Sequence, residues 1–135
     1  MAFIEANGIS FHYRLEGTGG QTVIFLHEIG GSLDSWDGVV PDLAKRFRVF
    51  RYDQRGFGLS EKTRTHYSIE DLVDDLQALV DALSLAPPFH VVSLAASSMT
   101  PHSTPTGRAL AHRYINAAKP DWFRILNTQL TFSAL

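Results

Sequence analysis

The sequence predicts an α/β fold in which an N-terminal hairpin precedes parallel strands connected by crossover helices. Residues 22–27, 47–53 and 89–94 are short apolar runs with β-branched or aromatic residues, as expected for strands buried on both faces of a parallel sheet. Helical patterns lie between these runs, and such alternation of strand and helix favours right-handed crossovers within one sheet. The length of 135 residues is sufficient for one domain with a hydrophobic core.

The first element is a hairpin centred on Asn7 and Gly8. Asn-Gly suits a two-residue hairpin turn, because both residues tolerate the positive φ angles that this turn requires. The flanking residues alternate loosely between apolar and polar types. We therefore expect strands at about residues 3–6 and 9–16.

Two helices are expected between the later strands. Residues 33–47 predict a short helix whose inward side chains are Trp36, Val40 and Leu43. Residues 67–85 predict the clearest helix, since their apolar side chains recur at helical spacing and form one stripe. Ser68 can cap this helix, with Asp71 three residues later as a variant of the capping box.

The composition changes near residue 98 and divides the chain into residues 1–98 and 99–135. The first part holds eight basic and thirteen acidic residues, a charge of −5, whereas the second holds four and one, a charge of +3. Nine of the ten glycines lie at or before Gly58. We expect the second part to be a divergent or out-of-frame tail, with at most a helix at 107–119 and a strand at 122–130.

Several classes of protein are disfavoured by the composition. The absence of cysteine excludes disulfides and thiolate chemistry, and no apolar run approaches the roughly 18 residues that span a membrane. The N-terminus has no signal-peptide pattern, so we expect a cytoplasmic protein. A net charge of −2 without a basic cluster argues against nucleic acid as a partner. The histidines show no ligand-like spacing, so neither a metal site nor a cofactor is expected.

Two loops carry a resemblance to a known family. The strand at 22–27 leads into the loop HEIGG, and the strand at 47–53 leads into the loop DQRGFGLS. Over about residues 3–98 the chain resembles the N-terminal half of α/β-hydrolase-fold enzymes, which include esterases, lactonases and C–C hydrolases. The first loop is similar to the His-Gly oxyanion loop of these enzymes, and the second to their Asp-x-Arg-Gly-x-Gly-x-Ser loop. The resemblance implies a truncated version of their sheet.

The resemblance also implies where a carbonyl oxygen would bind. Backbone N–H groups of Ile29 and Ala96 would form the oxyanion hole, which stabilises negative charge without reorganising. Gly30 and Gly31 would let the main chain approach a ligand closely. Glu28 replaces the usual glycine, and its carboxylate would oppose an oxyanion unless it points away.

The remaining motif residues are expected to be structural. His27 ends a buried strand and is interpreted as hydrogen-bonded scaffold rather than as an acid–base catalyst. Asp53 and Arg55 are expected to pair and hold their own loop. Four helix carboxylates are expected on a solvated face: Asp71, Asp74, Asp75 and Asp81.

The nucleophile of such hydrolases is missing from its expected place. Their serine lies in a Gly-x-Ser-x-Gly turn after the strand that corresponds to residues 89–94. Here Ala95 holds the serine position, and Ser97 is a weak substitute because a side chain two residues further along points elsewhere. The acid and histidine that should follow in that order are also missing, since Asp121 comes after both His102 and His112. The chain is therefore expected to be catalytically incompetent.

Three interpretations remain open. The chain is the front part of an ester or lactone hydrolase, cut short or shifted out of frame, whose unpaired apolar sheet edge would favour self-association. Alternatively, it is a complete non-catalytic protein that binds a small carbonyl compound or ester in the retained pocket. A third alternative is an unrelated enzyme that uses Glu28 or a histidine as a general base.

Overall fold

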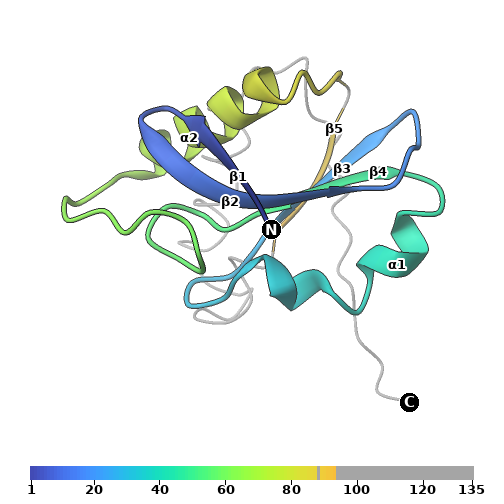
Figure 1. Ribbon diagram of the computed structural model, residues 1–135, viewed down its shortest axis with the longest axis horizontal. Helices are drawn as coiled ribbons and strands as arrows, with labels where there is room; N and C mark the ends of the chain where they lie inside the picture. Colours follow the sequence, from blue (N-terminus) through green and yellow to red (C-terminus); the bar gives the residue numbers. More distant parts are fainter. Residues whose placement is uncertain (88, 94–135) are drawn as a thin grey trace, which may run out of the picture.

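The computed structural model describes residues 1–87 and 89–93, which form a mixed sheet with helices on both faces (Figure 1). Its strands are β1 (Ala2–Ala6), β2 (Ile9–Glu16), β3 (Thr22–Leu26), β4 (Arg48–Tyr52) and β5 (Phe89–Ser93). Its helical elements are the 3-10 turn η1 (Leu33–Trp36) and the helices α1 (Val40–Leu43) and α2 (Ile69–Ala82). The strand order is β1-β2-β4-β3-β5, which confirms the predicted α/β class.

The strand directions follow the predicted plan of a hairpin followed by parallel strands. β1 and β2 pair antiparallel, β2 pairs antiparallel with β4, and β3 pairs parallel with both β4 and β5. Asn7 and Gly8 have φ angles of 48° and 71°, so they form the expected two-residue turn with positive backbone angles. Because β3 and β4 run parallel as neighbours, the loops that follow them leave from the same edge of the sheet.

A hydrophobic core lies on each face of the sheet. On one face, α2 packs through Leu76, Leu79 and Val80 against Phe11, Ile24 and Phe50. On the other face, η1 and α1 pack through Trp36 and Val40 against Val23, Phe25 and Val49. Strand β3 contributes to both cores and all of its residues are buried, as its continuous apolar run predicts.

The single helix predicted at 33–47 is wrong, because the segment divides into η1 and α1. Pro41 lies in the first turn of α1, where its missing N–H costs nothing, but it would break the interior of one long helix. The side chains nevertheless face as expected: Trp36 and Val40 are buried and Leu43 is half-buried.

Helix α2 begins as predicted. The Ser68 hydroxyl accepts a hydrogen bond from the Asp71 N–H at 3.2 Å, and the Asp71 carboxylate accepts one from the Ser68 N–H at 2.6 Å. The backbone N–H and the hydroxyl of Ser68 hold the pKa of Asp71 below its ordinary value. The two reciprocal bonds form the capping box that satisfies the first N–H groups of the helix.

Several predictions fall outside the described residues. These are the elbow residues Ala95, Ala96 and Ser97, the division at residue 98, and the elements expected at 107–119 and 122–130. Within the described residues, β5 ends the strand order and pairs with β3 alone.

Candidate functional site

The turn that follows β3 offers free hydrogen-bond donors. The Gly31 N–H donates a hydrogen bond to the Glu28 carbonyl at 3.0 Å. Gly30 has a φ of +85°, whereas the φ of Ile29 is not positive. This pattern defines a type II turn, in which only the third residue needs positive φ. Within residues 1–87 and 89–93, no acceptor receives the N–H of Ile29 or Gly30. The Ile29 residue is 65% exposed, so this turn can meet a ligand.

His27 holds the turn from inside the protein. Its Nε2 accepts a hydrogen bond from the Gln54 N–H at 2.9 Å, so its Nδ1 carries the proton and donates to the Glu28 carbonyl at 2.8 Å. The Gln54 side-chain amide returns a bond to the His27 carbonyl at 2.8 Å. Both ring nitrogens are therefore occupied, and the imidazole is placed to position the turn rather than to exchange protons with a ligand.

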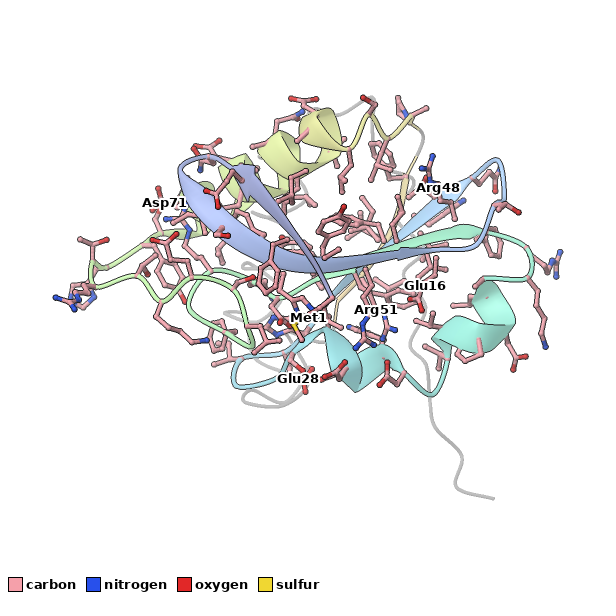
Figure 2. The ribbon with its side chains drawn as sticks, in the orientation of Figure 1. Met1, Glu16, Glu28, Arg48, Arg51 and Asp71 are labelled. Carbon is pink, nitrogen blue, oxygen red and sulfur yellow. The ribbon has the colours of Figure 1, made fainter. Side chains whose placement is uncertain are left out.

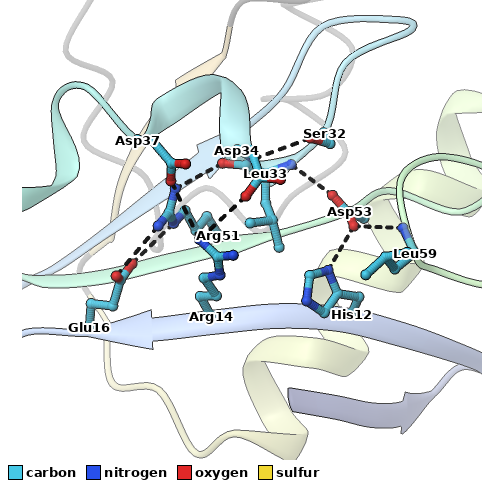
Figure 3. A network of polar contacts seen from close by, with 10 residues as sticks. All are labelled: His12, Arg14, Glu16, Ser32, Leu33, Asp34, Asp37, Arg51, Asp53 and Leu59. Carbon is cyan, nitrogen blue, oxygen red and sulfur yellow. Dashed lines mark hydrogen bonds and ion pairs between the residues drawn. The ribbon is translucent and has the colours of Figure 1, made fainter. Parts of the chain in front are cut away.

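Asp53 connects three separate segments (Figure 3). Its carboxylate accepts the backbone N–H groups of Leu33 at 2.7 Å and Leu59 at 2.8 Å, and the Nδ1–H of His12 at 2.8 Å. The residue is 1% exposed. Burial pushes the pKa of Asp53 upward, but the bonds from Leu33, Leu59 and His12 outweigh it and hold the pKa below its ordinary value. Gly58 is required here, because a Cβ would collide with this carboxylate.

The expected pairing of Asp53 with Arg55 is wrong. Arg55 instead binds Asp75 of α2, with Nε to Oδ2 at 2.6 Å and Nη2 to Oδ1 at 2.5 Å. The hydrogen bonds that Arg55 donates to the Asp75 carboxylate, opposed by burial, raise the pKa of Arg55 above its ordinary value. Arg55 thus fastens its loop to α2 rather than to its own neighbour.

The expectation that Asp75 lies on a solvated face is also wrong, since it is 1% exposed. It follows Leu72 by three residues and precedes Leu79 by four, which puts it on the inward side of α2. Besides Arg55, the Asn7 side-chain amide donates to it at 2.8 Å. Burial is tolerated because both carboxylate oxygens are paired.

Arg51 is a buried cation that the sequence reasoning missed. It donates through Nε to Glu16 at 3.0 Å, and through Nη1 to the Leu33 carbonyl at 3.0 Å and to Asp37 at 2.5 Å (Figure 3). These bonds fix η1 on the sheet. This element directly follows the turn at residues 28–31, which we call the glycine turn. An arginine in the middle of a buried strand was the available signal for this network.

The Glu28 carboxylate folds back onto its own turn and lies near η1 (Figure 2). Its Oε1 accepts the Ser35 hydroxyl at 3.0 Å. A Cβ built on Gly31 would lie 2.6 Å from the carboxyl carbon and from Oε1, so the carboxylate lies directly against Gly31. The carboxylate therefore lies against the turn and is bonded to one hydroxyl.

Other kinds of site are not supported in the part of the chain that the structure describes. No three histidine, aspartate or glutamate side chains gather there as metal ligands would. None of the helices there has both the length and the apolar character needed to cross a bilayer. A surface hollow of about 420 Å³ is lined by Met1, Ala2, Tyr13, Arg14, Leu15 and Glu16. None of these residues belongs to the glycine turn.

Comparison with known proteins finds one matching family, the alpha/beta hydrolase fold, over residues 21–94. The probable oxidoreductase EphD of Mycobacterium tuberculosis is 43% identical over 76 residues, which cover 55% of this chain and 13% of that protein. The 2-hydroxy-6-oxo-6-(2'-aminophenyl)hexa-2,4-dienoic acid hydrolase of Metapseudomonas resinovorans is 33% identical over 85 residues, covering 61% of this chain and 29% of that one. The chain thus spans less than a third of the length of either relative.

Solved structures give the same result. The enol-lactonase of Burkholderia xenovorans LB400 matches with a TM-score of 0.64 and 34% identity, over 70% of this chain and 38% of that one. Est816, described as an N-acyl homoserine lactone degrading enzyme, matches with a TM-score of 0.69 and 27% identity, over 92% of this chain and 42% of that one. The chain therefore matches less than half of the length of either solved structure.

Proposed function

Because this chain belongs to the α/β-hydrolase fold family, we propose that its glycine turn binds the carbonyl oxygen of a small ester or lactone without hydrolysing it. The observation that carries this proposal is the turn whose N–H groups, at Ile29 and Gly30, have no acceptor among the described residues. Fixed backbone donors stabilise partial negative charge on a carbonyl oxygen at no cost of reorganisation. The names of two structural neighbours, a lactonase and a lactone-degrading enzyme, support a lactone or ester as the ligand.

The turn is suited to this role because it is held rigidly. His27 and Gln54 connect it to the ends of β3 and β4, and Arg51 fixes the start of η1 behind it. Preorganised donors keep their direction when a ligand arrives. By family resemblance, the N–H of Ala96 would add a further donor.

The residue at the nucleophile position is the reason to expect binding without turnover. Acyl transfer by this family needs a serine oxygen to attack the carbonyl carbon, and Ala95 has only a methyl group there. We therefore expect the protein to bind a carbonyl compound and release it unchanged. The acid and histidine of a serine triad are likewise not found in the required order in this sequence.

The decisive experiment removes one N–H donor and retains the turn. Proline is favoured at the second position of a type II turn, so Ile29→Pro should retain the turn while deleting the donor; Ile29→Ala is the matched control. Titration of the 15N-labelled protein with γ-butyrolactone and with methyl propanoate should shift the Gly30 amide in the wild type and in the control. In Ile29→Pro we expect the affinity obtained from that titration to fall by about tenfold, the effect of one lost hydrogen bond. Equal responses of the two variants would refute the proposal.

A second candidate function is hydrolysis itself, favoured by the hydrolases among the relatives. It would require Ser97 to act in place of Ala95. Release of 4-nitrophenol from 4-nitrophenyl acetate, abolished by Ser97→Ala and unchanged in Ser98→Ala, would establish it. We expect no release above the rate in buffer.

A further inference from the structure

We infer that Glu28 makes this site selective for the charge of its ligand: it disfavours a carboxylate beside the bound carbonyl group and favours an ammonium group there. This inference rests on the proposed carbonyl-binding function and names the ligand class more narrowly. The charge preference comes from the position of the Glu28 carboxylate and from the absence of a cationic partner for it in residues 1–87 and 89–93.

The carboxylate is part of the turn that offers the donors. Its own backbone carbonyl closes the turn by accepting the Gly31 N–H at 3.0 Å. Its side chain lies so close to Gly31 that a Cβ there would be 2.6 Å from Oε1. The negative charge therefore lies within a few atoms of the N–H groups of Ile29 and Gly30.

Among the residues that the structure describes, no cation neutralises this negative charge. Ser35, a neutral hydroxyl, is the partner of Oε1, and the buried Oε2 has no hydrogen-bond partner among the residues described. Neighbouring His27 is a neutral imidazole with both nitrogens occupied. No ion pair reaches Glu28 within the described residues, although other carboxylates on this side of the sheet are paired: Glu16 and Asp37 with Arg51, and Asp34 with Arg14.

The donors and the carboxylate act on different parts of a ligand. The N–H groups attract the partial charge of a carbonyl oxygen, which forms short hydrogen bonds and gains most from them. A full charge on a substituent instead feels the carboxylate through space. At roughly 7 Å and an effective dielectric constant of about 35, Coulomb's law changes the affinity by about tenfold for one unit charge.

Three esters of matched size test this inference. Methyl propanoate is neutral; glycine methyl ester replaces its terminal methyl group with an ammonium group, and monomethyl malonate replaces it with a carboxylate. At about pH 6 both substituents are charged. Titrations monitored at the Gly30 amide of the full chain should give the affinity order ammonium, neutral, carboxylate, with about tenfold between neighbours.

The variant Glu28→Gln removes the charge and retains the shape. It should raise the affinity for monomethyl malonate by about tenfold, lower that for glycine methyl ester similarly, and leave methyl propanoate within about twofold. Asp74→Asn makes the same change of charge on the exposed face of α2 and should change none of the three. In the wild type, added salt should reduce the differences in affinity among the three esters, because ions screen the carboxylate.

The outcomes separate the two proposals. If methyl propanoate binds but the three affinities are equal, or if Glu28→Gln leaves their order unchanged, the charge selectivity is refuted and carbonyl binding stands. If none of the esters shifts the Gly30 amide, both proposals are refuted. A reversed order would show that a cation controls the site, and would also refute the inference.

Discussion

The loops that follow β3 and β4 leave the same edge of the sheet but use their polar groups in opposite ways. In the loop after β4, the side chains of Asp53, Gln54 and Arg55 are buried and bonded within the protein. In the turn after β3, Ile29 is exposed and two N–H groups have no acceptor among the described residues. The loop after β4 is therefore a supporting loop, whose side chains hold other segments of the protein. The turn after β3 is a presenting turn, whose N–H groups remain for a ligand. A ligand can use only those groups that folding has left unsatisfied, so the presenting turn is the better place to look for function.

The largest effect on stability should come from Asp53→Ala. The substitution leaves the N–H groups of Leu33 and Leu59 and the buried ring of His12 without their acceptor. We expect the free energy of unfolding in urea to fall by about 4 kcal/mol. Asp74→Ala, at an exposed carboxylate, should cost less than about 0.5 kcal/mol. Equal losses would mean that the loop after β4 is not the support described.

Asp75→Ala should have the next largest effect, about 3 kcal/mol, because Arg55 remains buried without its partner. The double variant Arg55→Met with Asp75→Leu removes both charges, and we expect it to recover part of that loss. Urea unfolding of Arg55→Met, of Asp75→Leu and of the double variant measures the coupling between these two residues. Additive losses would show that the pair does not stabilise the loop.

A smaller effect should appear on acidification. The pKa of Asp53 is lowered in the folded protein, so its stabilising contribution is complete above the ordinary aspartate pKa of about 3.9 and is lost as pH falls through the lower folded value. The free energy of unfolding of the wild type, measured in urea, should therefore fall below about pH 4. Asp53→Asn should show a shallower dependence over the same range, since it has no such proton to bind. Parallel curves would contradict the assigned direction.

The smallest effects should come from the presenting turn. Gly30→Ala forces a side chain onto a φ of +85° and should cost about 1 kcal/mol. Glu28→Gln retains the Ser35 hydrogen bond and should change the free energy of unfolding by less than about 0.5 kcal/mol. If the turn proved as sensitive as Asp53, the contrast between a supporting and a presenting loop would not hold.

The sequence predicts those parts of the fold that local chemistry decides. The Asn7-Gly8 turn, the capping box of Ser68 and Asp71, and the fully buried β3 each depend on a few neighbouring residues. Pro41 was also a local signal, and it would have divided the helix predicted at 33–47. Such features need no knowledge of distant segments.

Pairing between charged residues could not be predicted in the same way. Arg55 is two residues from Asp53, yet it binds Asp75, which lies twenty residues away in sequence. That choice depends on how α2 crosses the sheet, and periodicity alone does not place a guanidinium. The glycine turn was found because its residue types resemble a known loop, whereas the bonds of Gln54 that hold it left no signal in the pattern.

One oxygen atom connects the two loops. The Glu28 carbonyl accepts both the Gly31 N–H of the turn and the Nδ1–H of His27, whose other nitrogen receives the Gln54 N–H at the end of β4. Any rotation of that peptide group when the turn is occupied must change the bond to the imidazole. The 15N chemical shifts of a histidine ring distinguish its tautomers and respond to such bonds. The buried His27 ring is therefore a natural spectroscopic reporter of events at the surface of the turn.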